Sequence, residues 1–126
     1  MLLAGVNDGN EQASALAAQL AGVQPGLNMV SSFDAAFLAA LQTTLPAMPR
    51  ALISEELPED WQELAARLGL EALHLDKDIV TPGMVEAIHS SGLLVRVWTV
   101  NEPADMKRMI DASVDTVITD VPEAFL

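Results

Sequence analysis

Short apolar runs alternate along the chain with longer stretches of helical periodicity. Five runs rich in aliphatic and β-branched residues predict strands at Asn28–Ser32, Arg50–Ser54, Glu71–Leu75, Leu93–Thr99 and Asp115–Thr119. Their starts recur about every 22 residues, close to the shortest length of a strand plus a crossover helix. This period and order indicate parallel strands.

The stretches before and between these strands predict amphipathic helices. They cover Glu11–Ala21, Asp34–Thr44, Pro58–Leu68, Pro82 to the residue before Gly92, and Glu102–Ala112. Thr81 is expected to cap the fourth helix, with Pro82 at its first position. Gly92 is expected to end that helix in a left-handed conformation, and Asn101 to cap the fifth helix.

Alternating helices and strands with short connections fit either a doubly wound open sheet or part of a β/α barrel. The chain has no GxGxxG or GxxxxGK[ST] phosphate loop, which argues against a nucleotide-binding sheet. A complete eight-fold barrel needs about 250 residues, and this chain has 126. The prediction is therefore an α/β fold, a partial (β/α)8 barrel of about five βα units, in one domain over residues 1–126.

Composition removes several classes of function. The apolar fraction of 51% supports a packed core, and a net charge of -12 with scattered basic residues argues against nucleic-acid or anionic-lipid binding. The chain has no cysteine, which fits a reducing cytoplasm. No signal peptide is predicted because the apolar opening lacks a basic region, and no run approaches the 18 apolar residues of a membrane span.

Polar and aromatic residues follow the predicted strands, where the active site of a β/α barrel lies. His74 fits either a phosphate or metal contact or a hydrogen-bonded histidine at the barrel mouth. Trp98 and Phe33 fit either a substrate-stacking surface or barrel packing. Asp120 favours a turn or cap over a ligand contact, and His89 favours a dipole-stabilising position in the last turn of a helix.

Four segments, taken in order, resemble the bacterial glycerophosphodiester phosphodiesterase family. The combination is specific although each segment alone is weak. The segments are Ser31-Ser32-Phe33, Ala72-Leu73-His74, Val97-Trp98-Thr99-Val100-Asn101 and Val117-Ile118-Thr119-Asp120-Val121-Pro122.

The resemblance implies the C-terminal half of a cytoplasmic β/α-barrel hydrolase of lipid and glycerol metabolism, with this chain as strands four to eight. Such an enzyme cleaves glycerophosphodiesters to sn-glycerol 3-phosphate and an alcohol, with Ca²⁺ or Mg²⁺ as the usual cation. Carried over by motif, Phe33 and Trp98 would line the glycerol side of the pocket. His74 is the third residue expected to bind substrate.

The family's catalytic and metal-binding motifs are missing from the chain. No His-Arg-Gly, Glu-x-Asp or Glu-x-Lys occurs, so no catalytic residue or metal ligand is predicted and the chain alone is expected to be inactive. A misassigned start or an incomplete gene is the expected explanation. A further departure is Ser113, which stands where the family usually has a helix-ending glycine.

Two other interpretations stay open. A non-enzymatic half-barrel would act by pairing with a second polypeptide or with itself, because a first strand without its barrel neighbour leaves backbone groups unpaired. That open edge also predicts poor stability or self-association of the isolated chain. An unrelated small α/β binding domain is the third interpretation, which the ordered motifs argue against.

Overall fold

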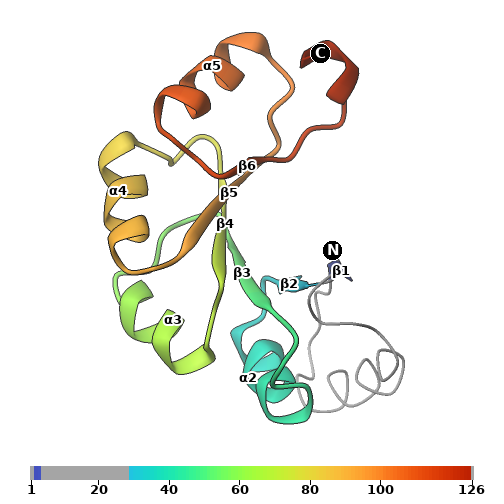
Figure 1. The fold of residues 1–126 in the computed structure, drawn as a ribbon, viewed down its shortest axis with the longest axis vertical. Coiled ribbons are helices and arrows are strands. Elements are labelled where there is room, and N and C mark those ends of the chain that lie inside the picture. Colours follow the sequence, from blue (N-terminus) through green and yellow to red (C-terminus); the bar gives the residue numbers. More distant parts are fainter. Residues whose placement is uncertain (1, 4–28, 126) are drawn as a thin grey trace. The chain divides into compact units, whose positions relative to one another are not determined.

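The structure is a computed structural model that describes residues 2–3 and 29–125 (Figure 1). The predicted helix Glu11–Ala21 lies outside the described residues. The chain divides into two compact units, one of residues 1–53 and 60–71 and the other of residues 54–59 and 72–126. Each unit is built from parallel strands and connecting helices.

In its described residues, 2–3, 29–53 and 60–71, the first unit contains three neighbouring parallel strands and two helices. Strand β1 pairs with β2, and β2 pairs with β3. The elements are β1 (Leu2–Leu3), β2 (Val30–Ser32), α2 (Ala35–Thr44), β3 (Arg50–Ser54) and α3 (Trp61–Leu68). The bounds of β3 agree with the prediction, whereas β1 was not predicted.

Helix α2 begins one residue after the predicted start, because Asp34 is its N-cap. The Asp34 carboxylate accepts hydrogen bonds from the backbone N–H groups of Ala36 at 2.9 Å and Phe37 at 3.2 Å. Phe37, Leu38 and Leu41 recur at helical spacing and are buried. The spacing of the large apolar residues therefore determines which face of α2 packs in the core.

Arg50 opens β3 and is buried, with 6% of its surface exposed. Its Nε donates to Leu68 O at 3.0 Å and its Nη1 to Met48 O at 3.0 Å. Longer bonds reach the carbonyls of Leu45, Pro46 and Gly69. These carbonyls follow or end helices α2 and α3, so one guanidinium satisfies acceptors that the helices leave unpaired.

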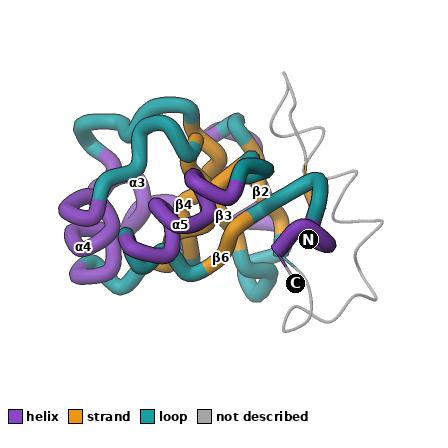
Figure 2. Tube along the Cα trace, turned by 90° about the horizontal axis from the view of Figure 1, so that it is seen from above, coloured by secondary structure: helices purple, strands orange, loops and turns teal. Residues whose placement is uncertain are grey.

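The second unit contains strands β4, β5 and β6, which are parallel and adjacent in chain order. Its elements are β4 (Ala72–Asp76), α4 (Pro82–Ser90), β5 (Leu94–Trp98), α5 (Pro103–Asp111), β6 (Thr116–Val117) and a 3-10 helix (Pro122–Phe125). Figure 2 shows the alternation of helix and strand along the chain. Strand β6 is shorter than the predicted Asp115–Thr119.

Strands β4 and β5 are in a register that sorts their side chains. His74 pairs with Arg96, and Asp76 with Trp98. The residues next to these four along each strand point to the opposite face, because strand side chains alternate. That opposite face belongs to the core, since its members are at most 1% exposed: Leu73, Leu75, Val95 and Val97.

The ends of α4 agree with the prediction, and the start of α5 does not. Thr81 Oγ1 accepts from Met84 N at 3.2 Å, and Gly92 follows the helix at φ 82°. Helix α5, however, has Glu102 as its N-cap, without a side-chain cap bond. The prediction that Asn101 caps α5 is wrong because its side chain bonds to residues after β6 instead.

Among residues 2–3 and 29–125, no helix is long and apolar enough to cross a membrane. The longest, α2, has ten residues, half of the about 20 that a span needs.

Candidate functional site

Trp98 is the last residue of β5 and lies at the carboxyl end of a parallel strand. Its indole Nε1 donates to His74 O at 3.3 Å, and its own carbonyl accepts from Lys77 N at 2.9 Å. The peptide bond from Trp98 to Thr99 is cis. The two hydrogen bonds attach the indole and the backbone of Trp98 to β4 and to the turn after it.

His74 lies in the middle of β4 and is 1% exposed. Its Nε2 is 3.3 Å from Arg96 Nη1. Burial, and then the positive charge of Arg96, lower the pKa of His74 to about 4. The imidazole is therefore neutral at pH 7, and its Nε2 accepts the hydrogen bond from the guanidinium, which can only donate.

The structure brings His74 and Trp98 together, in adjacent paired strands. A role for His74 in substrate binding stays a prediction. The burial of the ring favours the other interpretation given for this residue, a hydrogen-bonded histidine. In the described structure the His74 carbonyl supports Trp98, and the His74 ring supports Arg96.

Phe33 directly follows β2 in the first unit and is 52% exposed. The preceding residue shapes this turn, since Ser32 Oγ accepts from Asp34 N at 3.0 Å. An exposed aromatic ring after a strand end is compatible with the predicted contact to substrate. That role also stays a prediction.

A third group of polar residues lies after β5 and β6. Asn101 Oδ1 accepts from Thr119 Oγ1 and from Asp120 N, both at 3.0 Å, and Asn101 Nδ2 donates to Asp120 Oδ2 at 3.3 Å. Sequence reasoning missed this link, as it missed Arg96. The available signal was position, because Asn101 and Asp120 each follow a strand and parallel strand ends meet at one edge.

His89 and Asp115 form a separate link away from the strand ends. His89 Nε2 is 2.7 Å from Asp115 Oδ2, which also accepts from Val95 N at 2.7 Å. Partial burial raises the pKa of Asp115, but the hydrogen bonds from Val95 and His89 outweigh it and leave that pKa below its ordinary value. The link ties the end of α4 to the starts of β5 and β6, which is a structural role.

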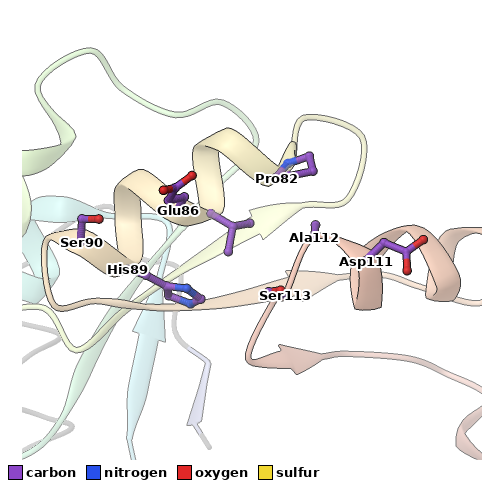
Figure 3. A pocket seen from close by; sticks show the side chains of 8 residues that line it. Pro82, Glu86, His89, Ser90, Asp111, Ala112 and Ser113 are labelled. Carbon is purple, nitrogen blue, oxygen red and sulfur yellow. The ribbon is translucent and has the colours of Figure 1, made fainter.

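A hollow in the second unit lies between helix α4 and the end of α5, with a volume of about 530 Å³ (Figure 3). It is on the helix side of the strands, and His89 in its wall is already paired with Asp115. Active sites of β/α barrels lie at the carboxyl ends of strands. We therefore place the candidate site at the strand ends and not in this hollow.

The described residues do not fit a divalent-cation site. Such a site needs several oxygen or nitrogen ligands in one place. Within residues 2–3 and 29–125, no group of three or more His, Cys, Asp or Glu side chains is arranged to hold a metal ion.

Parallel strands, connecting helices and a polar edge after the strands are typical of part of a β/α barrel. A model of the "Glycerophosphoryl diester phosphodiesterase family" matches residues 5–124. The chain therefore belongs to the glycerophosphoryl diester phosphodiesterase family. The predicted family and the predicted partial barrel are both confirmed.

A glycerophosphodiester phosphodiesterase of Caldanaerobacter subterraneus subsp. tengcongensis is 33% identical over 99 residues, which cover 78% of this chain and 40% of that protein. An Oleispira antarctica phosphodiesterase, solved in complex with the product sn-glycerol-3-phosphate, is 23% identical with a TM-score of 0.82 over 91% of this chain and 47% of that one. The Thermotoga maritima glycerophosphodiester phosphodiesterase is 22% identical with a TM-score of 0.73 over 99% of this chain and 56% of that one.

The two solved structures share the fold with this chain at low identity. The chain spans 40% or less of the length of the curated relatives it matches.

Proposed function

We propose that this chain is the C-terminal part of a glycerophosphodiester phosphodiesterase, a phosphoric diester hydrolase, and that it lines part of the substrate pocket. The complete enzyme would hydrolyse glycerophosphodiesters to sn-glycerol 3-phosphate and an alcohol. In this reaction the oxygen of water bonds to phosphorus, the bond from phosphorus to the alcohol oxygen breaks, and the alcohol leaves with a proton. The proposal includes a cytoplasmic location and a role in lipid and glycerol metabolism.

The observation that carries this proposal is the held indole of Trp98 at the end of β5. A ring fixed at a strand end offers an apolar face to the carbon atoms of glycerol at little cost in conformational entropy. Family membership supplies the reaction class, and the product bound to the Oleispira relative is sn-glycerol-3-phosphate.

The residues are proposed to bind the substrate or to position the residues that bind it. Trp98 and Phe33 would contact the glycerol group, and His74 would keep Trp98 and Arg96 in place. Dependence on a divalent cation, Ca²⁺ or Mg²⁺, belongs to the proposal for the complete enzyme. No described residue of this chain is proposed to bind that cation or to transfer a proton.

The test is a fused barrel, in which this chain follows the N-terminal part of the Caldanaerobacter relative that the alignment leaves uncovered. Trp98→Ala and Phe33→Ala should each raise KM for a glycerophosphodiester, by a factor corresponding to about 1–3 kcal/mol, with kcat little changed. Trp61→Ala removes an indole from the first residue of α3 and is the matched control.

A fused barrel that folds but does not hydrolyse the diester would contradict the proposed function. If it is active, and neither aromatic substitution changes the kinetics, the site assignment is wrong while the function stands.

A second test reads about 400 bases of DNA upstream of the Met1 codon, the length that the remaining βα units need. We expect an open frame that encodes His-Arg-Gly and Glu-x-Asp. A stop codon directly upstream would instead favour the half-barrel that pairs with a partner or with itself.

A further inference from the structure

Beyond their last register partners, the segments after β5 and β6 stay linked by a backbone hydrogen bond and by side-chain hydrogen bonds. The last register partners are Val97 and Val117. After them, Val100 N donates to Ile118 O at 2.9 Å. Val100 is fully buried, so this bond is shielded from water.

The side chain of Asn101 extends this pairing one step further. Its amide bonds Asp120 at two atoms, the backbone N–H and the carboxylate, and it accepts from the Thr119 hydroxyl. The amide thus makes the kind of two-way contact that a backbone peptide group makes in a ladder. The Asn101 side chain therefore adds to the backbone bond between Val100 and Ile118, and both link the segment after β5 to the segment after β6.

Trp98 lies between this attachment and the one to β4. On its β4 side, the indole bonds to His74 O, and the Trp98 carbonyl bonds to Lys77 N. On its other side, the three residues that follow end in the Asn101 contacts. A change at Asn101 therefore weakens one of the two attachments that determine where the indole lies, while the backbone bond from Val100 N to Ile118 O remains.

We propose that Asn101 is a positioning residue, which fixes the orientation of the Trp98 ring through its bonds to Thr119 and Asp120. This inference rests on the proposed function for its purpose, since the fixed ring would receive the glycerol group. Asn101 and Asp120 are exposed, and water competes for exposed hydrogen bonds, so these bonds add little to stability. Their effect is expected on the geometry of the ring.

The first experiment needs no substrate. In the 126-residue chain, Trp61→Phe leaves Trp98 as the only indole. We would then record the indole N–H resonance, the near-ultraviolet circular dichroism and the acrylamide quenching of Trp98 for Asn101→Ala, Asn101→Asp, and the exchange of both residues, Asn101→Asp with Asp120→Asn.

The exchange is the conservative rescue. Asn101→Asp alone keeps the acceptor for Thr119 and Asp120 N but places a carboxylate against the Asp120 carboxylate, at an atom separation of 3.3 Å in the parent structure. Adding Asp120→Asn restores a donor facing an acceptor. Thr81→Ala, which removes one exposed cap bond of α4 in the same unit, is the matched control.

The expected result is that Asn101→Ala and Asn101→Asp shift the indole resonance, weaken the dichroism and increase quenching, while the melting temperature falls by only about 2 °C. The exchange should restore the parent Trp98 spectrum, and Thr81→Ala should leave that spectrum unchanged. An unaltered Trp98 spectrum in Asn101→Ala overturns the inference. So does a loss of stability without rescue in the exchanged pair, which would show a merely structural role.

Kinetics in the fused barrel separate this inference from the proposed function. Asn101→Ala should raise KM about 10-fold with kcat retained, and the exchange should lower KM again. If the parent fused barrel is inactive, the proposed function fails, and the spectra still decide whether Asn101 positions Trp98. If the barrel is active but KM does not respond to Asn101→Ala, the positioning role is refuted alone.

Discussion

Removing the Arg50 guanidinium should cost the first unit much of its stability. Arg50→Met keeps an unbranched side chain of similar length and deletes every donor. The carbonyls of Leu68 and Met48, each bonded at 3.0 Å, would then lose a charged partner in a buried place. The other three bonds, at 3.3 to 3.5 Å, are partly buried, so water can replace them at less cost.

The magnitude follows from the two short bonds. A hydrogen bond to a charged group contributes about 1.5–3 kcal/mol, and a methionine side chain recovers part of the packing. We expect a loss of about 3 kcal/mol in the free energy of unfolding, or roughly 10 °C in melting temperature. Arg50→Lys should lose less, because an ammonium keeps the charge but not the planar fork of donors.

The assay is urea unfolding followed by tryptophan fluorescence. Trp98→Phe leaves Trp61, which begins α3 in the same unit as Arg50, as the probe. Arg67→Met is the matched control, because Arg67 is an exposed arginine on α3 and its loss should change stability by less than about 0.5 kcal/mol. A loss below about 1 kcal/mol in Arg50→Met, or one equal to the control, would refute the reasoning.

Three further predictions concern backbone conformation and one titrating group. Gly69→Ala should lower the free energy of unfolding in urea by about 1–2 kcal/mol, because Gly69 is at φ 61° and a Cβ there would meet Arg50 Nη2 at 2.8 Å. Gly83→Ala should stabilise the protein, because a Cβ at Gly83 would have nothing within 4 Å. Ser113→Gly should raise stability by about 1 kcal/mol, since Ser113 holds φ 65°, and an unchanged or lower melting temperature would contradict this. Because the pKa of His74 falls from 6.5 to about 4 on folding, the unfolded chain binds more protons in this window, so stability should drop by about 3 kcal/mol from pH 6.5 to pH 4. His74→Gln should flatten that dependence in unfolding measured across pH, and an equal slope in the variant would exclude His74 as its source.

The sequence was sufficient for elements whose determinants are local. Thr81 and Gly92 act on backbone groups within three residues, and each is found in the predicted role. The strand β3 agrees to the residue because an apolar run follows a proline and precedes an acidic turn. Family membership also followed from short ordered motifs.

The remaining features depend on residues that are distant in the chain. Arg50 bonds to carbonyls 18 and 19 residues away, so a single basic residue at the head of an apolar strand gave no sign of its partners. Asn101 stands in a position typical of a helix cap, but its side-chain amide bonds instead to residues 18 and 19 positions later in the chain. In both cases hydrogen bonds between residues distant in the chain determine the side chain's role, and local sequence patterns do not predict such bonds.

The register of β5 against β4 limits which insertions and deletions this family member can tolerate. Val95 and Val97 alternate with Arg96 and Trp98, so adding or removing one residue within β5 would exchange the two sets between faces. The valines would then lie on the face that now carries Arg96 and Trp98, and the arginine and the tryptophan would lie on the apolar face. Length changes are therefore expected in the helices and in the turns before the strands, and gaps within this strand should be selected against.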